Sequence, residues 1–368
     1  MGDCILVGCD LHDESMLLKV AVGAGAVRQQ LWRNSAAGRR AMIRGLRRDA
    51  ERVGANRVVF AYEASGLGFG LHDELTASGI ACHVLAPTKI ARSAQDRREK
   101  TDERDAQRLL DLVRAHVLAG NRLPSVWIPD RQTRDDRELV RARLDTSHKL
   151  TGVKTQVRTL LKRNGVSTPR AVGQSWTVGY RAWVASLAGG GEALGRGARL
   201  ALGSLLRQLE FLEQEAAGLD AHIAELAGGG RYAEPARELQ VLPGVGLLTA
   251  MVFLTEMGAL GRFSNRRQVG AYLGLVPSKH ESGESSDRKG HITRQGPARV
   301  RKVLCQAAWA RIRWDRSEGA AYARIAERNP RHRKVAVVAL MRRLAVQMWH
   351  VGQQAQERSG ALAAEAAV

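Results

Sequence analysis

The chain is poor in cysteine, and the few cysteines it has form no metal-binding or disulfide pattern. Its 368 residues include four cysteines, at positions 4, 9, 82 and 305, and no two have the Cys-x-x-Cys spacing. This distribution argues against a zinc site and against a disulfide framework. Cys4, Cys9 and Cys82 lie in predicted strands, and we expect them to be small core residues.

Long apolar runs are also absent. No uninterrupted apolar stretch has the length needed to span a bilayer, and the N-terminus lacks the basic start and cleavage pattern of a signal peptide. We therefore expect no membrane partner and a cytoplasmic, nucleoid-associated protein. A hydrophobic content of 44% excludes wholesale disorder, and the length allows two or three domains.

Acidic residues are scarce compared with basic ones. The chain has 37 Asp and Glu against 57 Lys and Arg, which gives a formal net charge of +20. This excess favours a polyanionic partner, although a generally basic, solvated surface is the alternative. Nucleic acid is the preferred partner because the positive charge is clustered. Residues 131–170 alone contain 11 Lys and Arg and 4 Asp and Glu.

The first 125 residues have the pattern of an α/β domain. Strand-like runs at 4–11, 15–22 and 26–33 precede a helix capped by Ser35, a strand at 57–63, a Gly-rich turn and helix at 66–78, a strand at 81–86 and helices to about 119. Three consecutive strands followed by alternating helix and strand is the order of a ribonuclease-H-like, or RuvC-like, domain. A doubly wound nucleotide-binding fold is disfavoured, because the turn at 12–14 is too short for a helix and no Gly-x-Gly-x-x-Gly follows the first strand.

The rest of the chain has helical periodicity. Apolar seams at about 130–165 and 199–227 predict two long helices that pair as an antiparallel coiled coil, within or between subunits. We assign residues 126–230 to this linker and oligomerisation region. After the glycines 228–230, residues 231–368 form a second, mostly helical domain.

Two carboxylates stand in or at the end of apolar strands. Asp10 interrupts the run that begins at Cys4, and Glu63 ends the run that begins at Val58. A buried carboxylate without a partner is costly, so an acid at such a position usually has a cation beside it. Mg²⁺ held for phosphate chemistry fits this pattern in a basic protein.

Two further acids lie on a helix whose apolar stripe includes Ala106 and Leu109. Asp102 and Asp105 each precede one of these residues by one turn, so both acids should face the sheet that carries Asp10. Four converging carboxylates need compensation, and two Mg²⁺ ions about 4 Å apart would provide it. Alternatively, the helical acids only favour the helix dipole, with Thr101 or Asp102 as the cap.

Two segments of the C-terminal domain have features of phosphate contacts. Val241-Leu242-Pro243-Gly244-Val245-Gly246 resembles the hairpin of a helix-hairpin-helix, in which Gly244 and Gly246 let backbone N–H groups approach a phosphate; an ordinary turn with a helix cap is the alternative. A later loop is rich in Lys and Arg, including Lys289 and Arg294. The residues alone do not separate Ser282 from Ser278, Ser285 or Ser286 as a nucleophile.

The motifs together resemble a known family. They occur in the order Gly8-Cys9-Asp10, Tyr62-Glu63-Ala64-Ser65-Gly66, Lys100-Thr101-Asp102-Glu103-Arg104-Asp105-Ala106, Leu242-Pro243-Gly244-Val245-Gly246, Gly274-Leu275-Val276-Pro277, Ser282-Gly283 and Gly290-His291-Ile292-Thr293. This set is similar to the Asp-Glu-Asp-Asp insertion-sequence transposases, the "insertion sequence one-ten" family, which includes the Piv-type DNA invertases. The resemblance covers residues 5 to 350 or so.

The resemblance implies a RuvC-like domain, a coiled-coil linker and a C-terminal transposase domain. It also implies that Asp10, Glu63, Asp102 and Asp105 bind Mg²⁺ and that Ser282 is the nucleophile. A serine that attacks a DNA phosphate gives a covalent phosphoserine and conserves bond energy for rejoining strands. The chain departs from the family at Glu281, where members often carry a second serine.

The resemblance further implies nucleic-acid and protein partners. Family members act as dimers or tetramers with active sites assembled in trans, and a bridge RNA pairs with donor and target DNA. The basic linker would then hold this RNA by its backbone. Its candidate contacts are Arg141, Lys149, Lys154, Arg158, Lys162 and Arg163.

Three other functions remain compatible with the residues. One is a Piv-type site-specific invertase, and another is a RuvC-like junction nuclease that uses water and no serine. The third is an architectural nucleic-acid-binding protein with a degenerate RuvC-like core.

Overall fold

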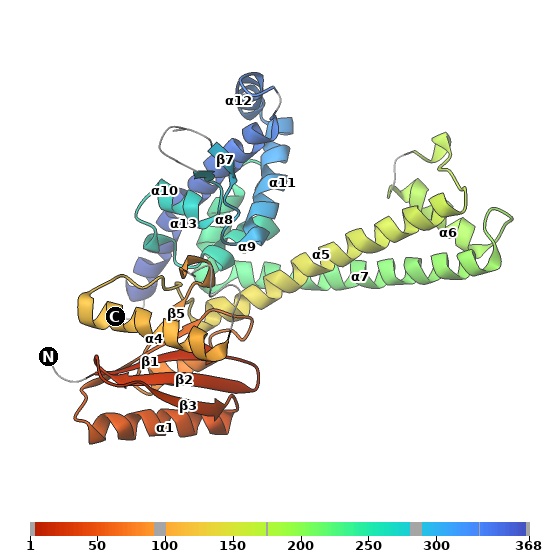
Figure 1. Ribbon diagram of the computed structural model, residues 1–368. Coiled ribbons are helices and arrows are strands. Elements are labelled where there is room, and N and C mark those ends of the chain that lie inside the picture. Colours follow the sequence, from red (N-terminus) through yellow and green to blue (C-terminus); the bar gives the residue numbers. More distant parts are fainter. Residues whose placement is uncertain (1–3, 92–100, 174–175, 280–288, 331, 366–368) are drawn as a thin grey trace. The chain divides into compact units, whose positions relative to one another are not determined.

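The computed structural model describes residues 4–91, 101–173, 176–279, 289–330 and 332–365, and it describes the side chains of these residues except at 279, 289 and 361–365. The chain divides into two compact units, Met1–Ile128 and Pro129–Val368, whose elements are drawn in Figure 1. Each unit has its own hydrophobic core.

The N-terminal unit is built on a five-stranded sheet of order β3-β2-β1-β4-β5. The strands are β1 (Cys4–Leu11), β2 (Ser15–Val22), β3 (Arg28–Arg33), β4 (Arg57–Glu63) and β5 (Ala81–Leu85). The first three are antiparallel neighbours, whereas β4 runs parallel to both β1 and β5. The predicted α/β character is confirmed. β3 starts two residues later than predicted, after a turn in which Gly23 has a φ of 51°.

Helices cover both faces of this sheet. Alternate β1 residues, among them Val7 and Cys9, pack with residues of α1 (Ala36–Arg52) and α2 (Gly70–Ala77), whereas Leu6 packs with residues of α4 (Asp102–Ala119). The Ser35 side chain accepts a hydrogen bond from the Gly38 N–H, so α1 begins where its cap predicts. A short 3-10 turn, η1 (Pro87–Lys89), follows β5.

The C-terminal unit begins with two long helices, α5 (Arg131–Arg163) and α7 (Arg196–Gly228), which lie side by side in Figure 1. Val140 lies in one apolar cluster with Ile223, and Leu161 lies in another with Leu202. Because the contacts run up one helix and down the other, the pair is antiparallel. Between the two helices come η2 (Arg170–Val172) and α6 (Val178–Gly189).

The remaining elements of this unit surround the buried helix α9 (Leu247–Met257). They are η3 (Gly230–Tyr232), α8 (Ala233–Gln240), η4 (Leu260–Arg262), α10 (Arg266–Tyr272), α11 (Ala298–Trp314), α12 (Arg316–Glu327) and α13 (Lys334–Glu365), with a hairpin of β6 (Pro277–Lys279) and β7 (Lys289–Ile292). Every α9 residue from Ala250 to Met257 is buried. The unit is mostly helical, as the sequence predicts. Within the described ranges, no helix combines the length and apolar character needed to cross a membrane.

Candidate metal centre and nucleic-acid surfaces

Two of the predicted acids lie at the carboxyl ends of neighbouring parallel strands. The β1–β4 register pairs Cys9 with Tyr62, and the next residues along the two strands are Asp10 and Glu63. Ala61 packs in the cluster on the α4 side of the sheet, so Glu63, two residues further on, points to that side. The same alternation, counted from Leu6, places Asp10 there. Adjacent strand ends therefore present two carboxylates on one face.

Gly8 allows α4 to lie directly on β1. A Cβ atom at this position would come within 2.2 Å of the Leu110 backbone nitrogen and 2.4 Å of the Ala106 carbonyl oxygen. Only glycine leaves room for backbone at this distance. Since Gly8 and Asp10 share one face of the strand, the close approach brings the start of α4 toward Asp10.

The first turn of α4 carries the other two predicted acids. Thr101 is the cap, because its side chain accepts a hydrogen bond from the Arg104 N–H. The Asp105 side chain is only 8% exposed and receives a 2.7 Å hydrogen bond from Arg108. The Asp102 side chain is 56% exposed. The prediction that both acids face the sheet is confirmed for Asp105 and wrong for Asp102, which is the first residue of the helix and lies at the exposed rim.

A histidine from the predicted turn at 12–14 joins this group of acids. His12 Nε2 lies 3.1 Å from Asp10 Oδ2 and 3.4 Å from Asp102 Oδ1. Among the described residues, Asp10, His12 and Asp102 form a group whose potential ligand atoms all lie within 4.8 Å of one another. His12 follows the end of β1, so its separation of two residues from Asp10 is the only signal in the sequence, and no apolar pattern indicates the contact.

The charges of this group influence one another. Burial raises the pKa of Asp10, the His12 contact opposes this, and the negative charges of Asp102 and Asp105 raise it further. Burial lowers the pKa of His12, but the two aspartates outweigh this effect, so its pKa is raised overall. Concentrated negative charge that favours a neighbouring cation is the electrostatic condition of a metal site.

The donor chemistry fits a hard divalent cation. Two carboxylates from separate segments converge, which suits Mg²⁺, and the imidazole beside them is also compatible with Mn²⁺. Glu63 and Asp105 are not members of the close group of ligand atoms found among the described residues. Binding of a second ion therefore stays a prediction.

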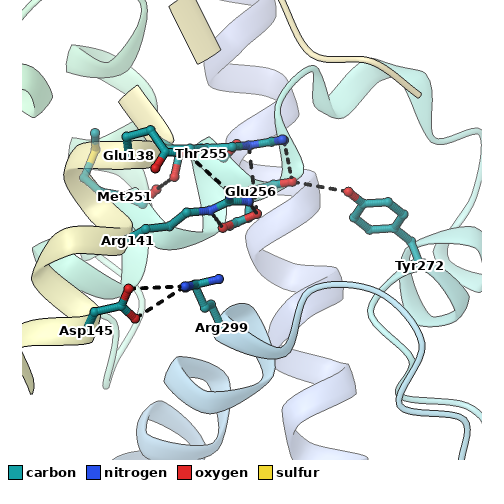
Figure 2. A network of polar contacts seen from close by, with 9 residues as sticks. Glu138, Arg141, Asp145, Met251, Thr255, Glu256, Tyr272 and Arg299 are labelled. Atoms are coloured by element: carbon teal, nitrogen blue, oxygen red, sulfur yellow. Dashed lines mark hydrogen bonds and ion pairs between the residues drawn. The ribbon is translucent and has the colours of Figure 1, made fainter. Parts of the chain in front are cut away.

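One predicted nucleic-acid contact is engaged inside the protein. Arg141 donates from Nε and Nη2 to the two carboxylate oxygens of Glu256, at 2.8 and 3.1 Å, and this network is shown in Figure 2. The hydrogen bonds to Glu256 raise the pKa of Arg141. Arg141 thus links α5 to α9.

The other basic linker residues are more accessible. Lys154 is half-buried, lies 5.3 Å above the Trp176 ring and is 3.9 Å from a Glu213 oxygen. The exposed members of the predicted set are Lys149, Arg158, Lys162 and Arg163. These four are distributed along one long helix, on more than one of its faces, and only Arg158 and Lys162, one turn apart, lie close to each other on the same face.

The two predicted hairpin glycines lie between α8 and α9. Gly244 has a φ of 78°, and a Cβ atom there would approach the Ala307 carbonyl oxygen to 2.8 Å, so packing against α11 is enough to require glycine. Gly246 is the N-cap of α9, and a Cβ atom there would meet no atom within 4 Å. The turn therefore has room for a side chain at Gly246 and none at Gly244.

The predicted nucleophile, Ser282, lies outside the described residues. Of the basic residues near it, Lys289 pairs with Lys279 in the β6–β7 hairpin. Arg294 is exposed and has a φ of 55°, which is rare for a residue other than glycine.

Comparison with protein families matches both units. A model described as "Transposase IS116/IS110/IS902 family" matches residues 236–324, and a second model, described as "Transposase", matches residues 7–164. The first includes α9, α11 and most of α12, and the second includes Asp10, Glu63, Asp102 and Asp105.

Relatives extend this similarity over most of the chain. The "Putative transposase y4rJ" of Sinorhizobium fredii is 30% identical over 85% of this chain and 82% of its own length. The "Putative transposase y4qE" of the same organism is 34% identical over 72% of this chain, although the match spans only 62% of that relative. The "Transposase for insertion sequence element IS1533" of Leptospira borgpetersenii is 26% identical over 69% of this chain and 70% of its own length. The chain belongs to the IS110/IS116/IS902 family of DEDD transposases.

Proposed function

We propose that the protein is a Mg²⁺-dependent DNA recombinase of an insertion sequence that cuts and rejoins strands through a serine nucleophile. The observation that carries the proposal is that Asp10 and Asp102, from distant segments of the chain, have potential ligand atoms within 4.8 Å of each other. Family membership supports DNA as the substrate. A divalent ion bound here would stabilise negative charge at the reacting phosphate.

The N-terminal unit is RuvC-like in this proposal. Its three antiparallel strands followed by two parallel ones, with α4 over the carboxyl ends of β1 and β4, support that assignment. Asp10 and Asp102 hold the ion, while Glu63 and Asp105 are the other two of the four metal-binding acids. His12 orients Asp10 through its 3.1 Å hydrogen bond.

Ser282 carries the covalent step. Its Oγ forms a bond to phosphorus as the bond to the leaving DNA oxygen breaks, and the hydroxyl proton leaves to a base or to water. The resulting phosphoserine ester keeps the energy of the phosphodiester, and the reverse attack by a DNA hydroxyl rejoins strands without an external energy source. Glu281, beside it, adds negative charge that alters the placement of phosphate.

A bridge RNA and a homo-oligomer complete the proposal. The exposed linker cations Lys149, Arg158, Lys162 and Arg163 are suited to hold an RNA backbone. The α5–α7 pair is the proposed oligomerisation element, and two or four subunits contribute RuvC-like domains and serines to shared active sites.

A strand-exchange assay with purified protein, element-end DNA and Mg²⁺ tests the chemistry. Ser282→Ala and Asp10→Asn should each abolish exchange while DNA binding and the thermal unfolding midpoint stay unchanged. Exchange by Ser282→Ala at the wild-type rate would remove the serine from the mechanism, and cleavage without rejoining would favour a water-using nuclease. Ser278→Ala is the matched control and should keep activity.

RNA guidance has a separate test. Sequencing the RNA that copurifies with the protein should recover one discrete species encoded beside the gene. Replacing Lys149, Arg158 and Lys162 with Ala should lower its yield about tenfold or more. Recovery of no discrete species from the wild-type protein would contradict the RNA part of the proposal and leave the catalytic part intact.

A further inference from the structure

The outward face of α11 is basic and carries no acid. Lys302, Gln306, Trp309 and Arg313 recur at spacings of four, three and four, which places them in one row along the helix. The opposite face packs into the core through residues such as Val303 and Ala307. The 17 residues of α11 contain five Lys and Arg and no Asp or Glu.

Two tryptophans are exposed on this basic helix. Trp314 is 78% exposed and Trp309 is 48% exposed. The Arg313 guanidinium lies 5.1 Å from the centre of the Trp314 ring, and the Trp309 ring lies 5.7 Å from that of Tyr322 on α12. Large aromatic side chains left in water beside cations are typical of interaction surfaces.

The acids next to these rings are engaged elsewhere. Asp315 caps α12 by accepting hydrogen bonds from the N–H groups of Ser317 and Glu318. Glu318 is buried and ion-paired with Arg311 and Arg343. On α12, in contrast, Arg316 and Arg324 are exposed. The surface around the tryptophans therefore offers positive charge to a partner.

We propose that this face of α11, together with the end of the helix where Trp314 lies, binds an unpaired DNA strand, with bases stacked on Trp309 and Trp314 and phosphates on Lys302 and Arg313. A duplex hides the faces of its bases, whereas a separated strand exposes them to aromatic rings. The choice of DNA over RNA rests on the proposed function, in which DNA is the substrate. Membership of a transposase family supports this substrate.

The location agrees with this role. α11 starts directly after the β6–β7 hairpin, and Arg301 fixes its first turn by donating to the carbonyl oxygens of Gln295 and Gly296 at 3.1 and 3.0 Å. The row of Lys302, Trp309 and Arg313 thus runs away from the hairpin along a rigid helix, which ends at Trp314. A strand separated during recombination would be held on this row.

The test measures binding without catalysis. A fluorescein-labelled oligo(dT) of about 12 nucleotides is titrated with full-length Ser282→Ala protein in EDTA, so failure of the metal or serine chemistry cannot affect the result. Trp314→Ala should raise the Kd about tenfold, and Trp314→Phe should restore most of the affinity. Arg313→Ala should reduce the slope of log Kd against log salt concentration by about the amount expected for one phosphate contact. Phe211→Ala, which removes a 60% exposed ring from α7, is the control and should change nothing.

Three results would overturn the inference. Equal affinity of wild type and Trp314→Ala for oligo(dT) would remove the stacking role. A change in oligomeric state with Trp314→Ala, at constant Kd, would assign the surface to a second copy of the chain. Binding of oligo(U) at least about tenfold tighter than oligo(dT) would assign it to RNA. Quenching of tryptophan fluorescence by oligo(dT), reduced in Trp314→Phe, is the signature of direct stacking.

Discussion

The geometry of the candidate metal centre depends on a residue that has no side chain. Asp10 and Asp102 converge because α4 lies on β1, and α4 lies there because Gly8 offers no Cβ. The sequence shows Gly8 only as part of a motif. Its role requires knowledge of which helix covers which face, and this knowledge comes from the fold.

Gly8→Ala tests this dependence. The new methyl group would clash with α4 backbone rather than with a flexible side chain, so we expect a loss of roughly 3 kcal/mol in the free energy of unfolding. Urea unfolding followed by circular dichroism measures it.

The control for Gly8→Ala is Gly45→Ala, in the same unit. A Cβ at Gly45 would lie 3.6 Å from the Trp32 ring, an ordinary contact, and alanine favours the helix by about 0.5–1 kcal/mol. The two glycine-to-alanine changes should therefore have opposite signs. Equal effects would show that α4 does not depend on Gly8.

Asp130, the cap of α5, gives a pH-dependent prediction. Burial opposes the shift, but hydrogen bonds from the Thr133 side chain and N–H, together with Arg231, lower its pKa to about 2. A lowered pKa in the folded state stabilises the protein above pH 4 or so, and this contribution is lost as the pH falls toward about 2. Asp130→Ala should therefore lower the melting temperature at about pH 6, and the difference from wild type should shrink by about pH 3. A difference that stays constant with pH would contradict this account.

At the scale of elements, α5 is fixed to the C-terminal core by buried polar contacts. Arg137 donates to the carbonyl oxygens of Thr255 and Glu256 at the end of α9, at 2.6 and 3.0 Å, and Arg141 pairs with the Glu256 carboxylate. Figure 2 shows the Arg141–Glu256 contact between the two helices. Removing one charge from such a pair leaves the other buried and uncompensated.

Glu256→Ala should therefore lower the free energy of unfolding by about 3 kcal/mol. Glu138→Ala is the matched control, because Glu138 also contacts Arg141, at 3.5 Å, but is exposed on the helix surface. Its removal should cost less than about 1 kcal/mol. Urea unfolding of both variants decides the matter, and similar losses would mean that the Arg141–Glu256 pair does not anchor α5.

Periodicity and caps predict most elements but not the partners of their side chains. The apolar pattern placed β1, β2 and β4 correctly, and Ser35 marked the start of α1. Arg141 illustrates the limit, because a count of local charge cannot show that its partner is a glutamate about a hundred residues later. The predicted Gly-rich turn and helix over 66–78 are confirmed, since Gly68 has a φ of 70° in the turn and α2 begins after it at Gly70.

At the scale of the whole molecule, the proposed function divides its chemistry between the two units. The carboxylates lie at the strand ends and helix start of the first unit, and the proposed serine and DNA-binding helix belong to the second. The spacing of acids in the sequence predicted where Asp10 and Asp105 would lie. It did not predict His12, because a residue in an exposed turn gives no apolar pattern from which to infer a contact.

The central claim is that Asp10 and Asp102 hold a divalent metal, and titration of the full-length protein with Mn²⁺, monitored by electron paramagnetic resonance, tests it most directly. Asp10→Asn and Asp102→Asn should each weaken Mn²⁺ binding at least about tenfold, because each removes a charged ligand. Asp145→Asn, which alters an exposed acid paired with Arg299, should bind Mn²⁺ as the wild type does. Equal Mn²⁺ affinity of wild type and Asp10→Asn would contradict the account.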